Sequence, residues 1–172
     1  MRIVAGTLRG RRIEAPEGTE TRPTTDRVRE AVFNALGSLD LLVDAQVADL
    51  FAGSGALGIE ALSRGAAHCW FVEKDRRAIA VLRRNLADLG LEAQATVVPA
   101  DAATWVRGMP AVDLVLADPP YQFEGWAGLL GEVRAPFVVA EADRAIEPTP
   151  GWDAQRTKRY GRTHVTFLGA VD

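Results

Sequence analysis

The sequence predicts an α/β fold in which helices cover a mainly parallel, seven-stranded sheet and an antiparallel hairpin closes one edge of that sheet. From residue 47 to residue 141, short apolar runs alternate with helical patterns, which is typical of parallel strands joined by crossover helices. Near the C-terminus the pattern changes, and two extended runs, 153–158 and 164–168, flank a turn at Gly161. At 172 residues, the chain is long enough to bury a substantial core as one such fold.

The residues before this alternating region form a basic extension. Two short extended runs, 2–5 and 11–15, flank Gly10 and predict a hairpin. A linker that contains proline and glycine follows, since these residues interrupt regular structure. The sequence therefore divides into an N-terminal extension, residues 1–23, and a main domain, residues 24–172.

A helix opens the main domain. Thr24 or Thr25 can cap its N-terminus, and its apolar pattern continues to Leu36. The apolar side chains share one face of this helix, and we expect Arg27 and Arg29 to project elsewhere.

The alternating region supplies the remaining elements. Their expected bounds are strand 47–51, helix 56–64, strand 68–73, helix 75–89, strand 95–99, short helix 102–107, strand 112–117, helix 125–133 and strand 137–141. Because the carboxyl ends of parallel strands share one edge of a sheet, residues that follow these strands are expected to meet there.

The strand expected at 112–117 leads into the tetrapeptide Asp118, Pro119, Pro120 and Tyr121. These residues suit methylation of an exocyclic amino nitrogen, which is a poor nucleophile because its lone pair is delocalised into the base. The Asp118 carboxylate and the Pro119 carbonyl can accept its two hydrogens and turn the lone pair towards an electrophile, while Tyr121 offers a ring for stacking. The two prolines fix the backbone. A simple Pro-Pro turn that ends a strand would contain the same residues.

A glycine-rich loop follows the first strand of the alternating region. Gly53, Gly55 and Gly58 form the pattern G-x-G-x-x-G between a strand and a helix, where backbone approaches a nucleotide-like ligand closely. Glu73, twenty residues beyond Gly53, ends the next strand and can accept both ribose hydroxyls, and Asp101 follows the third strand, in position to meet an adenine edge. The candidate cofactor-binding residues are Asp49, Phe51, Gly53, Ser54, Gly55, Gly58, Glu73, Asp101 and Ala102.

S-adenosylmethionine and NAD would both use the glycine loop and Glu73. The Asp-Pro-Pro-Tyr motif has no role in hydride transfer. In addition, a carboxylate as close to the loop as that of Asp49 suits a cation better than a pyrophosphate. The sequence therefore favours S-adenosylmethionine, with a dinucleotide-dependent dehydrogenase as the alternative in a different enzyme class.

Charge is distributed unevenly around a net value of −3. Residues 1–29 contain seven arginines and four acids, residues 156–162 contain four basic residues and no acid, and residues 30–155 contain nine basic and eighteen acidic residues. Basic ends on an acidic body suit contact with a phosphate backbone at the rim of a cofactor site. A solvated arginine-rich surface is the plainer alternative.

The cysteine and histidine content and the length of the apolar runs limit the class of protein further. The one cysteine, Cys69, is expected to be a small buried apolar side chain, which agrees with a reducing, cytoplasmic setting. No apolar run reaches the length of a membrane span, and the two histidines, His68 and His164, are far apart, so we expect neither a membrane partner nor a metal site. We expect a monomer.

The chain resembles the RsmD family, bacterial methyltransferases that act on N2 of a guanine in 16S ribosomal RNA. The resemblance extends from Arg2-Ile3-Val4-Ala5-Gly6 to Tyr160-Gly161 and includes the glycine loop and the Asp-Pro-Pro-Tyr motif. Its most specific part is the block R-P-T-T-D-R-V-R-E-A at residues 22–31, and it departs from the family in the short stretch 122–126. The resemblance implies a Rossmann-like class I methyltransferase fold, S-adenosylmethionine as donor, and a substrate within the small ribosomal subunit as a ribonucleoprotein.

The resemblance also implies an RNA-binding set: Arg9, Arg11 and Arg12 as phosphate contacts, and Arg22, Thr24 and Arg27 close to the RNA or the base pocket. Two further readings stay open. The amino substrate could instead be a DNA adenine or a protein amide, or the chain could be an RNA-binding assembly factor without turnover.

Overall fold

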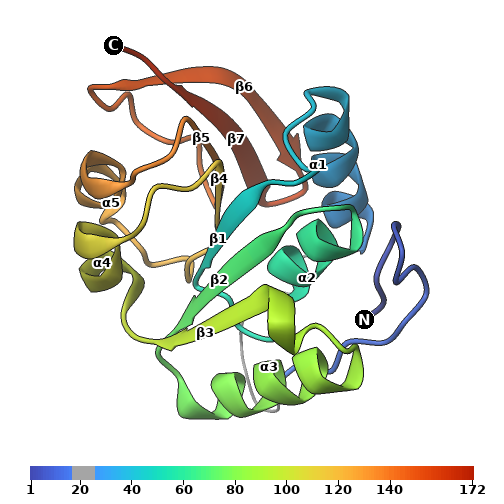
Figure 1. The fold of residues 1–172 in the computed structure, drawn as a ribbon. Coiled ribbons are helices and arrows are strands. Elements are labelled where there is room, and N and C mark those ends of the chain that lie inside the picture. The colour runs from blue at the N-terminus through green and yellow to red at the C-terminus, as the bar shows by residue number, and fades with distance from the viewer. Residues whose placement is uncertain (17–25) are drawn as a thin grey trace.

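A twisted sheet forms the centre of the computed structural model, which describes residues 1–16 and 26–172 (Figure 1). Its order is β3-β2-β1-β4-β5-β7-β6. The strands are β1 (Gln46–Leu50), β2 (His68–Glu73), β3 (Ala95–Pro99), β4 (Leu114–Ala117), β5 (Phe137–Ala142), β6 (Trp152–Tyr160) and β7 (Thr163–Ala170). Strands β1 to β5 are mutually parallel, and β7 pairs antiparallel with β5 and with β6. The prediction of a seven-stranded, mainly parallel sheet with a closing hairpin is confirmed.

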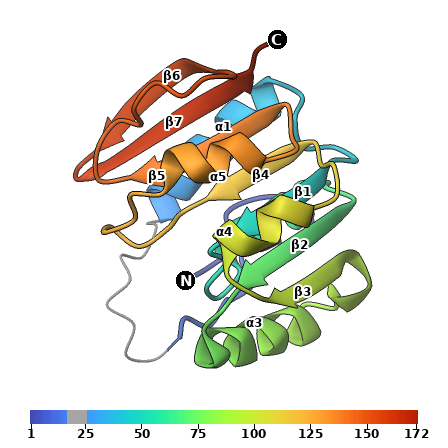
Figure 2. The same cartoon turned by 90° about the vertical axis from the view of Figure 1, so that its left-hand side faces the viewer.

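Helices cover both faces of this sheet. They are α1 (Asp26–Ser38), α2 (Ala56–Ser63), α3 (Arg76–Asp88), α4 (Ala102–Trp105) and α5 (Trp126–Glu132), with 3₁₀ turns at Glu92–Gln94 and Val106–Gly108. Figures 1 and 2 show α1, α2 and α3 on one face and α4 and α5 on the other. Successive strand residues point to opposite faces of the sheet. Val47 therefore belongs to the core beneath α1, α2 and α3, and Ala48 belongs to the core beneath α4 and α5. No described helix is both long enough and apolar enough to span a bilayer.

Most predicted bounds differ from the observed ones by one or two residues, and the last two strands, β6 and β7, extend beyond the predicted ranges 153–158 and 164–168 at both ends. Helix α1 continues through Gly37 to Ser38, and β4 begins at Leu114 instead of residue 112. The Asp113 side chain explains why β4 begins late. Its carboxylate accepts the backbone N–H of Gln46 at 2.7 Å and so replaces the backbone carbonyl that would pair with the start of β1. The expected caps Thr24 and Thr25 and the proposed boundary at residue 23 lie outside the described residues.

The N-terminal hairpin is less regular than predicted. It has one antiparallel bridge, between Arg2 and Arg12, in place of two paired strands. Ile3 donates its backbone N–H to Arg11 at 2.9 Å, and Ile13 donates to Met1 at 2.9 Å. The side chains of Ile3 and Ile13 are buried in the same core as α1 and α2, so apolar burial holds this hairpin in place.

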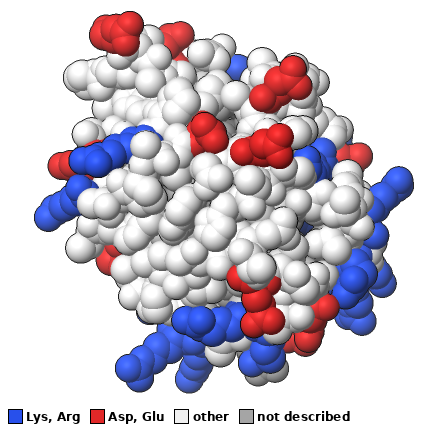
Figure 3. Space-filling view, viewed as in Figure 1, with Lys and Arg blue, Asp and Glu red and all other residues white. Residues whose placement is uncertain are grey.

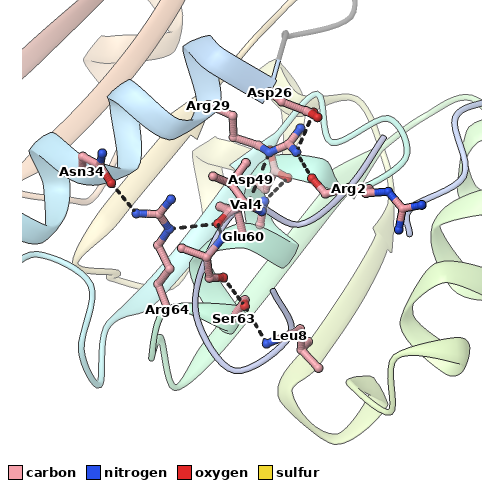
Figure 4. Close-up of polar contacts among 12 residues, drawn as sticks. Arg2, Val4, Leu8, Asp26, Arg29, Asn34, Asp49, Glu60, Ser63 and Arg64 are labelled. Atoms are coloured by element: carbon pink, nitrogen blue, oxygen red, sulfur yellow. Dashed lines mark hydrogen bonds and ion pairs between the residues drawn. The ribbon is translucent and has the colours of Figure 1, made fainter. Parts of the chain in front are cut away.

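Glu60, in the middle of α2, joins three segments of the chain (Figure 4). Its carboxylate accepts the backbone N–H groups of Val4 at 2.9 Å and Ala5 at 3.1 Å. It also accepts Nε of Arg29 at 3.3 Å and Nε of Arg64 at 2.9 Å. Glu60 and Arg29 are fully buried, so the expectation that Arg29 projects away from the apolar face of its helix was wrong.

Neighbouring polar groups extend this network. Arg29 donates through Nη2 to the Arg2 carbonyl and, at 3.0 Å, to the Asp26 carboxylate. One turn beyond Glu60, the Ser63 hydroxyl donates to the Ala5 carbonyl at 2.6 Å and accepts the backbone N–H of Leu8 at 3.0 Å. Polar contacts to α1 and α2 therefore fix the N-terminal segment, in addition to apolar packing.

We expect Glu60→Ala to lower the free energy of unfolding by about 3–5 kcal/mol, because it leaves the buried Arg29 guanidinium without its buried counter-charge and with only the exposed Asp26 carboxylate beside it. Urea unfolding followed by circular dichroism measures this change. The control is Glu30→Ala, an exposed acid on α1 whose loss should change stability by no more than about 0.5 kcal/mol. Equal effects of the two substitutions would show that the network contributes no net stability.

Candidate active site

The carboxyl ends of β1, β2, β3 and β4 lie along one edge of the sheet, on the left in Figure 2. The glycine loop follows β1, and Glu73 is the last residue of β2. Asp101 follows β3, and Asp118 follows β4 directly. The structure therefore brings the four predicted groups to the same edge, although they are separated by long stretches of sequence.

The three glycines of the loop serve two purposes. A Cβ at Gly55 would lie 2.5 Å from Leu82, and one at Gly58 would lie 2.4 Å from the Phe71 ring, so these two positions allow α2 to pack tightly on its neighbours. Gly53 has a φ of +58°, and a Cβ there would meet nothing within 4 Å. The surface above Gly53 is thus open, and a ligand can approach its backbone closely.

Phe51 links the glycine loop to the segment that follows the Asp-Pro-Pro-Tyr motif. It has a positive φ of 60°, a conformation that costs a non-glycine residue on the order of 1 kcal/mol and that occurs often at functional sites. Its ring packs edge-on against Phe123 at 5.2 Å between centroids, and Phe123 packs against Trp126 at 5.3 Å. The short stretch 122–126 therefore rests on the predicted cofactor loop.

Backbone donors hold the Glu73 carboxylate in place. Its Oε1 atom accepts the N–H of Gly53 at 2.8 Å, and its Oε2 atom accepts those of Lys74 at 2.9 Å and Asp75 at 2.8 Å. Since a carboxylate has about four acceptor positions, it retains capacity for a further donor. Backbone N–H groups therefore orient the Glu73 carboxylate, while its role towards ribose stays a prediction.

Asp101 caps α4. Its Oδ2 atom accepts the backbone N–H and the hydroxyl of Thr104, each at 3.2 Å, and its Oδ1 atom lies 4.0 Å from Nζ of Lys74. The neighbouring Ala102 is buried. Asp101 is therefore the N-cap of α4, and its contact with an adenine stays a prediction that depends on Oδ1.

Asp49 lies beneath the glycine loop, where its buried carboxylate accepts the N–H of Gly58 at 2.9 Å. Burial raises the pKa of Asp49 well above its usual value; the hydrogen bond from Gly58 opposes this, and repulsion from Asp118 and Glu73 adds to it. Burial, with the nearby Asp49 carboxylate, also raises the pKa of the Cys69 thiol. Asp49 thus has the carboxyl groups of Asp118 and Glu73 close by at the edge of an open loop, an arrangement that fits a cationic ligand.

The Asp-Pro-Pro-Tyr motif forms the rim of this acidic region. Asp118 is half-buried, Pro119 is buried and Pro120 is exposed. The Pro120 carbonyl accepts the backbone N–H of Phe123 at 2.9 Å, which turns the chain directly after the motif. Tyr121 is 38% exposed, so its aromatic side chain is accessible to a stacking partner.

The predicted RNA-binding residues do not all lie at this edge. Arg9, Arg11 and Arg12 are exposed, and Arg11 donates to the Asp88 carbonyl at 3.0 Å. Asp88 ends α3, whose thirteen residues span about 20 Å from the site edge towards the opposite one. Arg27 is exposed in the first turn of α1, whose N-terminal end lies at the site edge in Figure 2. The other two residues of the set, Arg22 and Thr24, lie outside the described residues.

Basic side chains also gather beside the N-terminal hairpin. Figure 3 shows Lys and Arg along the lower and right-hand margins of the molecule, where α3 and the N-terminal segment lie in Figure 1. The exposed arginines on α3 are Arg76, Arg77, Arg83 and Arg84. Arg76 and Arg77 begin α3 shortly after Glu73, so this basic surface extends from the site edge along α3 towards the N-terminal hairpin.

Sequence reasoning missed Asn85, a buried residue of α3 that supports the glycine loop. Its Nδ2 atom donates to the carbonyls of Ser54 at 3.0 Å and Glu14 at 2.9 Å, and its Oδ1 atom accepts the N–H of Glu14 at 3.0 Å. A polar residue inside the apolar stripe of α3 was the signal available in the sequence. Within residues 1–16 and 26–172, no cluster of His, Cys, Asp and Glu is arranged to hold a metal ion.

Comparison with known proteins shows which family and which relatives the chain is similar to. Residues 1–169 match the family described as "Conserved hypothetical protein 95". The chain is 39% identical to "Putative rRNA methyltransferase YlbH" of Bacillus subtilis, over 97% of each chain. It is 38% identical to "Ribosomal RNA small subunit methyltransferase D" of Escherichia coli, over 94% of this chain and 86% of that protein.

A solved structure gives the same result for the fold. The structure named "Putative methyltransferase yhhF from Escherichia coli" superposes with a TM-score of 0.87 at 36% identity and covers 99% of this chain and 97% of that one. Together with the strand order, this likeness identifies the Rossmann-like class I methyltransferase fold that the sequence predicted.

We expect Asp49→Asn to stabilise the protein increasingly as the pH rises. The folded-state pKa of Asp49 lies above its usual value of 3.8, so its contribution to stability is complete below that pH and is lost as the pH rises through the folded-state pKa. Asparagine does not titrate, and its Oδ1 atom can still accept the Gly58 N–H. Thermal melts across a pH series, with the exposed Asp153→Asn as control, measure the difference from wild type. A difference in melting temperature between Asp49→Asn and wild type that did not change with pH would contradict a raised pKa of Asp49 as the cause.

Proposed function

The chain belongs to the RsmD family, whose model bears the description "Conserved hypothetical protein 95", and from this premise we propose that it methylates N2 of a guanine in 16S ribosomal RNA, with S-adenosylmethionine as donor. The observation that carries this proposal is the position of Asp118 and Tyr121 at the end of β4, beside the glycine loop and its carboxylates. The names of the Bacillus subtilis and Escherichia coli relatives support ribosomal RNA as the substrate class.

The residues around the glycine loop fit the proposed donor. When bound, S-adenosylmethionine supplies an electrophilic methyl group on a sulfonium cation. The acidic cluster of Asp49, Glu73 and Asp118 favours a positive charge, and the open surface at Gly53 allows close approach. The residues that would hold the donor are Asp49, Phe51, Gly53, Ser54, Gly55, Gly58, Glu73, Asp101 and Ala102.

On the substrate side, Tyr121 stacks on a guanine that has been extruded from the RNA. The Asp118 carboxylate and the Pro119 carbonyl each accept one hydrogen of the exocyclic amino group and direct its lone pair towards the methyl group. Pro120 keeps the turn rigid. The rate comes chiefly from this positioning, because no strong base is required before transfer. After transfer, one N2 proton leaves through Asp118 or directly to water.

We expect Asp118→Ala to abolish methyl transfer while donor binding remains close to wild type. The assay is transfer of a labelled methyl group to small ribosomal subunits from a strain that lacks this gene, followed by nuclease digestion and nucleoside analysis. The control is Asp153→Ala, an exposed acid at the start of β6, away from the site edge. Label in N2-methylguanosine at one position supports the proposal, whereas a near-normal rate for Asp118→Ala would remove its assigned role.

The same assay separates the alternatives. Transfer to DNA or protein but not to subunits would redirect the proposal to another amino substrate. Donor binding without transfer to any of these substrates would indicate an RNA-binding assembly factor.

We expect Glu73→Gln to weaken donor binding roughly ten- to hundred-fold, since it replaces hydrogen bonds to a charged acceptor with weaker ones. Isothermal titration calorimetry with S-adenosylmethionine measures this change. Glu92→Gln, at an exposed position in the 3₁₀ turn before β3, is the matched control. An unchanged affinity in a variant that melts at the wild-type temperature would exclude the ribose role.

A further inference from the structure

A second pocket opens beside the Asp-Pro-Pro-Tyr motif. Its volume is about 310 Å³, and its lining residues are Tyr121, Asp143, Arg159, Arg162 and His164. These residues come from three segments: the turn after β4, the turn after β5, and the hairpin of β6 and β7. None of the basic residues in this pocket belongs to the RNA-binding set that the sequence analysis assigned.

The topology of the sheet explains why this pocket lies at the active-site edge. Strand β7 runs antiparallel to β5 and begins where β5 ends, so that Ala142 pairs with His164. The turn at Gly161 and Arg162 therefore projects beyond the carboxyl end of β5. Figure 2 shows this turn on the left, at the same edge as the loop that follows β4.

The guanidinium groups of Arg159 and Arg162 make the pocket suitable for an anion. Arg159 and His164 are directly opposite each other on β6 and β7, so the guanidinium and the imidazole share one face. The Nε atom of Arg159 donates to the Gly161 carbonyl at 2.8 Å, which steadies its guanidinium. The lining acid, Asp143, is already within 3.5 Å of Arg144.

The arginines retain donors for a ligand. Among the described residues, Arg162 forms neither a hydrogen bond nor an ion pair, and the Nη groups of Arg159 have no partner. A guanidinium presents a planar fork of N–H donors that matches the oxygens of a phosphate, so two of them around one pocket favour that ligand.

We propose that this pocket binds a backbone phosphate of the RNA next to the nucleotide that is methylated. The inference rests on the proposed function, because a guanine stacked on Tyr121 brings its flanking phosphates to the same rim of the protein. The pocket shares Tyr121 with the base site, so the two contacts hold one strand at adjoining points. Through Arg159 and Arg162, the hairpin of β6 and β7 thereby fixes the register of the RNA strand without contacting its bases.

The decisive variant is Arg159→Ala/Arg162→Ala, tested by binding to small ribosomal subunits over a series of salt concentrations. We expect affinity to fall roughly ten- to hundred-fold, since hydrogen bonds between charged partners are lost. We also expect the slope of log affinity against log salt to decrease by about one, as for the loss of one phosphate contact. In the transfer assay, KM for subunits should rise while donor affinity stays unchanged.

The same hairpin offers a matched control. Arg156 and Lys158 occupy alternate positions on β6, on the face opposite Arg159, so Arg156→Ala/Lys158→Ala removes the same charge from the same hairpin. This control should keep the wild-type KM and most of the affinity. Equal losses in the two double variants would show that general charge, not the pocket, binds RNA, and would overturn the proposal.

Conservative replacement tests the geometry. Arg159→Lys/Arg162→Lys keeps both charges but removes the planar forks, so we expect it to recover the salt slope and only part of the affinity. Complete recovery of affinity would exclude a site built around guanidinium geometry.

The outcomes also separate this proposal from the one that it rests on. If wild-type protein methylates subunits but Arg159→Ala/Arg162→Ala keeps the wild-type affinity and salt slope, the pocket assignment is wrong and the proposed function stands. If wild-type protein neither binds nor methylates subunits, both are rejected.

Discussion

The buried Glu60 carboxylate is the contact on which the arrangement of the active site depends. Moving a carboxylate and a guanidinium out of water is costly, and that cost is offset only when the groups find several well-placed partners. Glu60 has four donors, two from the N-terminal segment and one each from Arg29 and Arg64. Because α2 begins at the glycine loop, an interaction that holds α1, α2 and the N-terminus together also holds that loop against β1.

At the candidate active-site edge, two features lower the stability of the protein and fit the ligand of the proposed function. Asp49 is a buried carboxylate beside two others, and Phe51 has a backbone conformation that is unfavourable for a side chain. Neither feature helps the protein to fold. Both place charge and backbone where a cation with a nucleoside can use them, which is the usual relation between stability and function at binding sites.

The sequence was sufficient for the sheet because alternation of apolar runs and helical patterns is a local signal. It also located the glycine loop, Glu73 and Asp118, since a parallel sheet brings the ends of its strands together. It failed for Arg29, because a charged residue in a helix is assumed to face water unless its partner is known. That partner, Glu60, lies thirty-one residues further along the chain. The basic run 156–162 indicated phosphate contact by its charge, but the pocket that Arg159 and Arg162 line was not predictable, because its walls come from three segments whose proximity depends on the pairing of β5 with β7.

The contact of Phe51 with Phe123 has a thermodynamic consequence. Phe51 belongs to the loop whose Gly53 N–H binds Glu73, and Phe123 follows Tyr121 by two residues, so the two loops share one aromatic contact. A ligand that orders one of these loops lowers the entropy that remains to be lost when the other is occupied. The two binding events are then linked, and linkage is reciprocal: whatever factor the first ligand adds to the affinity for the second, the second adds to the affinity for the first. Under the proposed function, the edge-on contacts among Phe51, Phe123 and Trp126 therefore join the donor site to the base site.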